Sequence, residues 1–274
     1  MTRPLQNTWR YAILGLMVFM VAAPIYWMLT ISFKTSRDIY RLPSLFPTAP
    51  TLDNYRVLLV DKHFLVNIGN SLIVAGAVTF VSVIASSLAA YSLVRYKYPV
   101  RRGLGRMILL AYLTPTSLLF VPLSIIVANL NLGNSLHGLV AVYLAFSVPF
   151  CTWLLMGYFR GIPPDLEEQA MVDGTTRLGA FARVLIPLSA PGLVATAIFT
   201  FAGAWNELLL ALIFITSEGT RTVPLALQYL ITGDVFLWGP IMAGAVFSAL
   251  PVMILYFLAQ RFVAQGLTGG SIKG

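Results

Sequence analysis

Four carboxylates gather in one short polar stretch that lies between two long apolar segments. They are Asp165, Glu167, Glu168 and Asp173, and Gly174 follows at once. Acids in the first turn of a helix are stabilised by the positive end of the helix dipole, and glycine suits the left-handed position after its end. The pattern therefore predicts a short capped helix with an acidic face, on which Glu168 can meet a basic or polar group of another protein.

The same stretch also offers apolar contacts at helical spacing. Leu166, Ala170 and Met171 are expected to share one helix face. A second helical stretch, Thr176–Leu185, is expected to follow and to end before Pro187. One interpretation is a plain connector between larger elements. Its length favours an interaction element instead, because long structured loops are often functional.

A single acid, Glu207, lies inside another apolar segment. Thr196, Thr200, Gly203 and Glu207 follow one another at i, i+4, i+7 and i+11 and are expected to share one helix face, with Asn206 beside the acid. An acid within a membrane usually faces a bundle interior or a watery cavity. Two interpretations stay open, namely a stripe that lines a transport pathway and a packing seam in which Glu207 bonds to a neighbouring helix.

The sequence lacks the patterns that would place a reaction on this chain. It contains no G-x-x-x-x-G-K-[ST] phosphate loop, no G-x-S-x-G nucleophile motif and no cluster of Cys and His with metal-ligand spacing. We therefore expect no catalytic residue, no metal and no cofactor on the chain itself. Its one cysteine, Cys151, lies in an apolar run and is expected to be a small buried side chain.

The elements that must position these residues are membrane helices. Of 274 residues, 58% are hydrophobic and 10% are charged, whereas soluble domains carry about 25% charged residues. A helix needs about 20 apolar residues to cross the hydrocarbon core. Six segments qualify, and they cover roughly residues 11–31, 71–94, 107–128, 136–159, 192–215 and 240–262. We predict an all-α, polytopic membrane protein in which residues 1–274 form one integral-membrane domain.

The basic residues orient these segments. Lys and Arg gather after the second and fourth segments and at both ends of the chain. The positive-inside rule then places both termini in the cytoplasm, together with the loop over about residues 160–190. The first outer loop is an exception because it also holds basic residues, and its Asp53-Asn54 step predicts a short surface helix outside the membrane. The net charge of +8 thus reflects topology, and nucleic acid is not expected as a partner.

The loop over residues 160–190 resembles the EAA loop of ABC-importer permeases. That pattern is E-A-A, three residues, G, nine residues and then I-x-L-P. This chain has Glu168-Gln169-Ala170, then Gly174, then Val184-Leu185-Ile186-Pro187 at the same spacing. It departs from the pattern at Gln169, which replaces the first alanine, and in two aliphatic exchanges.

The resemblance extends over nearly the whole chain. Gly157-Tyr158-Phe159, Trp205-Asn206-Glu207 and the tail 266–274 are similar to MalG-type permease subunits of carbohydrate importers, and at a finer level to the SugB-type subunits of mycobacterial trehalose importers. It implies a type I ABC-importer permease fold in a bacterial inner membrane and a sugar such as trehalose or maltose. The implied partners are a second permease subunit, two cytoplasmic ATPase subunits that bind ATP and Mg²⁺, and an extracytoplasmic sugar-binding protein. Membrane lipid is a further expected partner.

The resemblance also assigns roles to residues. It implies that the loop couples transport to the ATPase, through Leu166, Glu167, Glu168, Ala170, Met171, Asp173 and Gly174. It further implies that the tail reaches between the ATPase subunits. Two rival functions are an ion-coupled secondary transporter, which should carry ionisable groups at the midplane or broken, repeated helices, and a membrane enzyme, which needs a clustered catalytic set.

Overall fold

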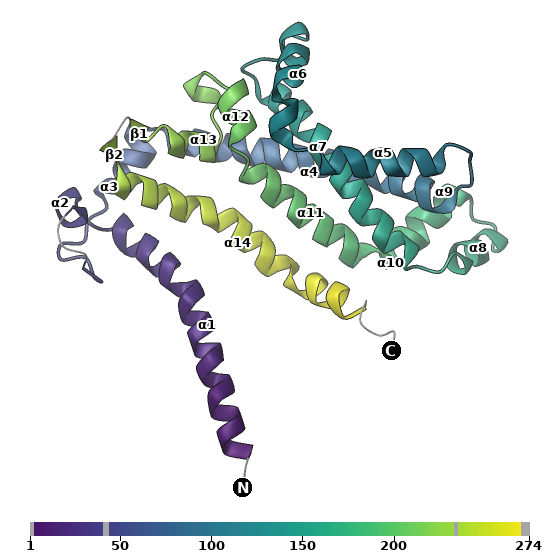
Figure 1. The fold of residues 1–274 in the computed structure, drawn as a ribbon, viewed down its shortest axis with the longest axis horizontal. Helices are drawn as coiled ribbons and strands as arrows, with labels where there is room; N and C mark the ends of the chain where they lie inside the picture. Colours follow the sequence, from purple (N-terminus) through teal and green to yellow (C-terminus); the bar gives the residue numbers. More distant parts are fainter. Residues whose placement is uncertain (1–2, 41–43, 233–234, 270–274) are drawn as a thin grey trace. The chain divides into compact units, whose positions relative to one another are not determined.

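The computed structural model describes residues 3–40, 44–232 and 235–269, most of which lie in helices (Figure 1). The helices are α1 (Arg3–Ser32), α2 (Ser36–Ile39), α3 (Asp53–Arg56), α4 (Phe64–Arg95), α5 (Arg101–Leu113), α6 (Thr116–Asn129), α7 (Leu136–Arg160), α8 (Asp165–Val172), α9 (Arg177–Ala180), α10 (Ile186–Leu188), α11 (Ala190–Trp205), α12 (Leu209–Phe214), α13 (Val223–Gln228) and α14 (Trp238–Gly269). Val57–Asp61 and Phe181–Leu185 are π-helical turns, and Glu218–Thr220 is a 3-10 turn. Two short antiparallel strands, β1 (Ile231–Thr232) and β2 (Val235–Phe236), form the only sheet among these residues.

The membrane-spanning character of the chain is carried by four long helices and two bent helix pairs. The long helices are α1, α4, α7 and α14, and they contain the first, second, fourth and sixth predicted segments. The bent pairs are α5 with α6, at 100°, and Arg177–Leu188 with α11, at 76°. Counting each bent pair as one span gives up to six spans, consistent with the six predicted segments. In the second pair, only α11 lies in the fifth predicted segment, and Arg177–Leu188 belongs to the predicted loop 160–190.

The third predicted segment, 107–128, is divided, so its expected continuity is wrong. α5 ends at Leu113 and α6 begins at Thr116. Pro115 has no N–H to donate and disfavours helical backbone in the residue before it. Thr114 is accordingly extended, with φ −70° and ψ 125°. The two halves therefore leave the break in different directions.

The fifth predicted segment, 192–215, is also interrupted. α11 ends at Trp205, where the backbone N–H and the side-chain Nδ2 of Asn206 both donate to the carbonyl of Ala202. α12 then begins at Leu209, because Glu207 accepts hydrogen bonds from the first N–H groups of that helix. Glu207 thus lies after α11 and not on it, which corrects the expected helix face.

The chain divides into two compact units, the first within Met1–Leu65 and Ala226–Pro251 and the second within Val66–Leu225 and Val252–Gly274. In the first unit, the short helix predicted at Asp53-Asn54 is present as α3. Asn54 in α3 is buried, and its Nδ2 donates to the carbonyls of Ser32 and Lys34 at 2.9 and 2.8 Å. The segment that contains α3 is therefore attached to the end of α1.

In the second unit, α7 is the central helix. It contacts α5, α6, α11 and α12 and contributes to both hydrophobic cores of this unit. Its packing on α11 is close at Gly192, because a Cβ there would meet the ring of Tyr158. The second core contains Leu155 and Phe159 from α7 and Tyr91 from α4, and it lies next to α8 and α9. α8 lies at one end of this unit, beyond α10 (Figure 1).

Candidate functional site

The acidic stretch forms the capped helix that its sequence predicts. α8 covers Asp165–Val172, and the N–H groups of Glu167 and Glu168 both donate to the carbonyl of Pro164. After the helix, Gly174 has a φ of +90°, and its N–H donates to the carbonyl of Met171 at 3.1 Å. A Cβ at Gly174 would meet no atom within 4 Å. The requirement for glycine is therefore one of backbone conformation and not of space.

The second helical stretch continues further than expected. Thr176 caps α9 by accepting a hydrogen bond from the N–H of Gly179 at 3.1 Å. The chain then passes through a π-helical turn, in which the N–H of Ile186 donates to the carbonyl of Phe181. Pro187 follows inside α10, so the expected end before Pro187 is wrong, and the helix ends instead at Leu188. The wider π-helical turn before Pro187 changes the register of the backbone hydrogen bonds. The helix can therefore continue past Pro187, which has no N–H to donate.

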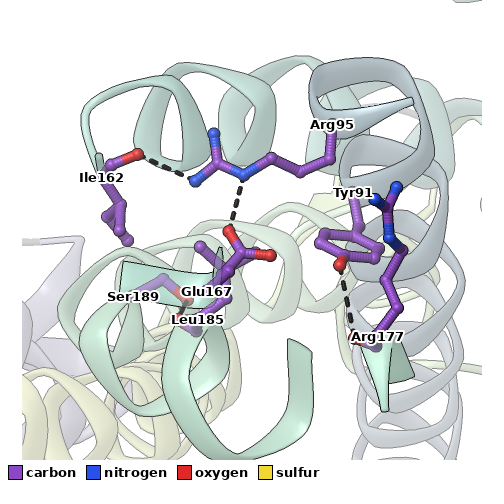
Figure 2. Close-up of polar contacts among 7 residues, drawn as sticks. All are labelled: Tyr91, Arg95, Ile162, Glu167, Arg177, Leu185 and Ser189. Carbon is purple, nitrogen blue, oxygen red and sulfur yellow. Dashed lines mark hydrogen bonds and ion pairs between the residues drawn. The ribbon is translucent and has the colours of Figure 1, made fainter. Parts of the chain in front are cut away.

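Glu167 points into the protein and is held there by α4. It is 4% exposed, and its Oε1 lies 2.6 Å from Nε of Arg95, the last residue of α4. Arg95 also donates from Nη2 to the carbonyl of Ile162 at 2.8 Å (Figure 2). One guanidinium therefore holds both the entry to the loop and the first turn of α8. Planar geometry and several donors suit arginine to such a bridge.

The second half of the loop, from Arg177 to Leu185, is held by the same end of α4. The ring of Tyr91 packs on that of Phe181 with a centroid distance of 4.6 Å. The Tyr91 hydroxyl points toward the carbonyl of Arg177 at 3.4 Å, as Figure 2 shows. The guanidinium of Arg177 lies over the ring of Tyr96 at 5.0 Å. Residues at the end of α4 thus contact both halves of the loop, so the loop is packed against the helix bundle.

The outer surface of the loop is apolar with acids around it. Leu166, Val172 and Leu178 are 39%, 87% and 66% exposed. Three acids, Asp165, Glu168 and Asp173, are exposed as well, whereas Ala170 and Met171 are half-buried. Exposed aliphatic side chains among charges are typical of a surface that contacts another protein.

A cavity of about 540 Å³ opens where α5 meets α6, between α7 and α11, and we call it the α5–α6 cavity. Its hydrogen-bonding side chains include Thr114, Thr116, Tyr143, Ser147, Thr200 and Glu207, and its aromatic ones include Tyr112, Phe146, Phe150 and Phe199. The break in the third span therefore brings polar groups and aromatic rings into one recess.

Glu207 connects three elements at this cavity. Its Oε2 accepts a hydrogen bond from the hydroxyl of Tyr143 on α7 at 2.7 Å. Its two oxygens also accept from the N–H of Leu210 at 2.9 and 3.1 Å, and Oε2 accepts from the N–H of Ala211 at 3.2 Å. The carboxylate thus caps α12, bonds to α7 and borders the cavity. Both open interpretations of this acid, pathway and packing, have support in its position.

Comparison with known proteins decides the family. Residues 82–269 match the model of the binding-protein-dependent transport system inner membrane component family. The chain belongs to that family. Its members and relatives identify it as a multi-pass, inner-membrane permease subunit of a carbohydrate ABC importer.

Two relatives and one solved structure illustrate the likeness. The permease is 39% identical over 252 residues to the sulfoquinovosyl glycerol transport system permease protein SmoH of Agrobacterium fabrum, covering 92% of this chain and 88% of that one. It is 36% identical to the trehalose/maltose transport system permease protein MalG of Thermococcus litoralis, with 94% of both chains covered. The fold is similar to that of one chain in a crystal structure of a bacterial ABC transporter involved in the import of the acidic polysaccharide alginate. The TM-score is 0.81 and the sequence identity is 20%, and the match covers 96% of this chain and 99% of that one.

The structure sorts the predicted loop residues of the permease into two groups. Leu166, Glu168 and Asp173 are on the outside of the loop, whereas Glu167 is inside. Sequence reasoning counted Glu167 among the ATPase-coupling residues and did not single out Val172 or Leu178. Arg95, a basic residue at the end of the second span, was the signal that could have predicted a partner for Glu167. Of the tail, residues 270–274 lie outside the described residues.

The predicted pathway residues of the permease are also divided. Thr200, Gly203 and Glu207 line the α5–α6 cavity. Thr196 is fully buried, donates to the carbonyl of Gly192 and does not line this cavity. Asn206 is exposed and caps α11. Sequence reasoning missed the contributions of α5 and α7, because the aromatic side chains there do not stand out within an apolar span.

Proposed function

We propose that this permease forms one half of the translocation pathway for a small sugar, a disaccharide such as trehalose or maltose, and that α8 transmits to it the motion of a separate ATPase. The observation that supports the coupling role most directly is the contrast between the two sides of α8. Its inner side is fixed by the buried pair of Glu167 and Arg95, and its outer side exposes apolar residues. A helix so built can receive a displacement from a partner and pass it to α4.

ATP hydrolysis belongs, in this proposal, to other chains. The permease has no phosphate-loop motif, so two cytoplasmic ATPase subunits would bind ATP and Mg²⁺, and the permease itself would bind no cofactor. The loop that contacts them would then be cytoplasmic, together with both termini. The basic residues that follow α4 and α7 support that orientation.

The α5–α6 cavity supports a carbohydrate as the transported molecule. Its volume lies within the ~300–1,000 Å³ range of small-molecule pockets. Aromatic rings such as Tyr112 and Phe150 can cover the apolar face of a sugar ring, while Glu207 and the exposed Thr116 can bond to its hydroxyls. The rest of the pathway would come from a second permease subunit, and an extracytoplasmic sugar-binding protein would deliver the molecule, in keeping with the family description.

The broken spans do not favour an ion-coupled secondary transporter. Interrupted helices are common in such transporters, where they form midplane ion sites. Here the breaks accompany membership of a binding-protein-dependent family. The single acid at a break, Glu207, is already bonded by a tyrosine and two backbone N–H groups. The importer remains the function that these residues support best.

The test compares one substitution at two glycines. Gly174→Asp forces a side chain onto a φ of +90°, whereas Gly219→Asp places the same side chain in open space on the outer side. We expect the first variant to lose co-purifying ATPase and the uptake of labelled trehalose and maltose, and the second to keep both. Membrane insertion is followed in parallel. Full ATPase retention and wild-type uptake in Gly174→Asp would refute the coupling role.

A further inference from the structure

A second cavity of the permease, with a volume of about 640 Å³, lies between the end of α4, the start of α5 and the last turns of α7. Four arginines line it, and they are Arg101, Arg102, Arg106 and Arg160. Its other side chains are almost all apolar, with Trp153 the largest. We call it the arginine pocket.

The positive charge of the arginine pocket is not balanced within the described part of the chain. No acid lines the pocket. The described ion pairs are Arg95 with Glu167 and Arg221 with Glu218, so no described carboxylate lies within 4.0 Å of any of the four arginines. Arg101 bonds to a backbone carbonyl, that of Tyr96, at 3.0 Å. Like charges held close together repel, and an anion in the pocket would relieve that repulsion.

An exposed apolar surface continues from these charges along α5. Arg102, Arg106 and Leu110 follow at i, i+4 and i+8 and therefore lie along one side of the helix. Leu110 and Met107, one turn before it, are each 65% exposed. Charge thus occupies the first turns of α5, and apolar side chains occupy the turns that extend deeper into the span. An amphiphile with an anionic head and hydrocarbon chains matches this order of residues.

We propose that the arginine pocket binds the phosphate headgroup of an anionic phospholipid, whose acyl chains lie along the exposed apolar side of α5. Arginine recognises phosphate through paired N–H donors, and basic pockets between membrane helices are suited to such headgroups. The pocket adjoins the loop proposed to couple transport, because Arg160 ends α7 and Gly161 begins that loop. A bound lipid would fix α5 against α7 at the base of the loop. Its location in the cytoplasmic leaflet rests on the topology that we propose above.

The experiment measures lipid binding and not transport, so its result is independent of the coupling role of α8. The purified transporter complex is placed in nanodiscs of phosphatidylcholine that contain a small fraction of fluorescent phosphatidylglycerol, and energy transfer from the permease reports binding. The variants are Arg102→Gln with Arg106→Gln, and Arg160→Gln alone in case the double variant does not assemble. Lys97→Gln is the matched control, because it removes one exposed charge near the pocket without lining it.

We expect the double variant to bind phosphatidylglycerol at least roughly tenfold more weakly than the wild type, since each basic residue adds to the attraction for an anionic headgroup. Arg160→Gln should weaken binding by less, and Lys97→Gln should leave it unchanged. Equal binding by wild type and both pocket variants would overturn the proposal, as would an equal loss in Lys97→Gln. Competition by inorganic phosphate separates a headgroup site from a free-anion site. Full displacement of the lipid by phosphate at millimolar concentration would overturn the assignment to a lipid.

Discussion

Arg95 and Glu167 are separated by 72 residues in the sequence, and their side chains meet at 2.6 Å in the interior of the protein. The side chains are only 12% and 5% exposed, so water does little to weaken their attraction. The pair joins the end of α4 to the first turn of α8. If one of these helices moves, the other must therefore move with it, or the two buried charges must separate.

Removing one member of this pair should be costly. Glu167→Ala leaves Arg95 buried without its carboxylate, and breaking a buried pair in this way typically costs ~3–5 kcal/mol. We expect a lower melting temperature of the purified complex and weaker retention of the ATPase. Glu168→Ala, at the exposed neighbouring position, is the matched control for the melting temperature alone and should change stability by less than about 1 kcal/mol. An exchange of the two residues, Arg95→Glu with Glu167→Arg, should recover part of the loss, and equal melting temperatures for both alanine variants would contradict this role.

The outer face of the loop should contribute to ATPase binding without contributing to folding. Val172 and Leu178 are 87% and 66% exposed, and burying an aliphatic side chain in an interface contributes ~1.5–3 kcal/mol. We expect Val172→Ser and Leu178→Ser each to weaken ATPase binding by roughly tenfold or more, with the melting temperature of the permease alone unchanged. Affinity is measured with the ATPase in solution and the permease in nanodiscs. Val60→Ser, at an exposed position of the other unit, serves as the control.

Substitution of Glu207 should reduce transport more than it reduces the amount of protein. Glu207→Gln keeps an oxygen that can accept from Tyr143 and from the start of α12, but it loses the charge that strengthens both bonds. Hydrogen bonds to charged groups contribute about 1.5–3 kcal/mol, so a moderate loss of stability and a larger loss of uptake are expected. Uptake and abundance are measured in the same cells. A parallel fall of the two would assign Glu207 to packing alone, and Tyr143→Phe should then show the same parallel fall.

The orientation of the chain can be tested by labelling. Cys151 is fully buried, and its replacement by serine gives a background without cysteine. In that background Ser217→Cys, on the proposed outer side, should react with an impermeant maleimide in intact cells. Lys97→Cys should react only after the membrane is opened. The reverse order of reaction would invert the topology and remove the argument for a cytoplasmic loop.

The elements that local signals specify were predictable from the sequence, and those that depend on tertiary partners were not. Acids in the first turn and Gly174 at the end defined α8 closely, because both act within one helical turn. The side chain of Glu167 points inward because it pairs with Arg95 on another helix. No pattern within the loop itself could have predicted that direction. The hydropathy averaged over residues 107–128 did not indicate the break between α5 and α6, although Pro115 in the sequence could have predicted it.

The short length of α5 has a consequence for what a transported molecule contacts. Its 13 residues, at about 1.5 Å each, reach roughly 20 Å, whereas the hydrocarbon core is ~30 Å thick. The last four carbonyl groups of a helix have no partner within it, and here the hydroxyl of Thr114 donates to the first of the four, that of Leu110. The next three residues, Ala111 to Leu113, all border the α5–α6 cavity. In the proposed pathway, their main-chain oxygens would be available to the hydroxyl groups of a sugar, and alanine scanning, which leaves the main chain unchanged, would not detect that part of recognition.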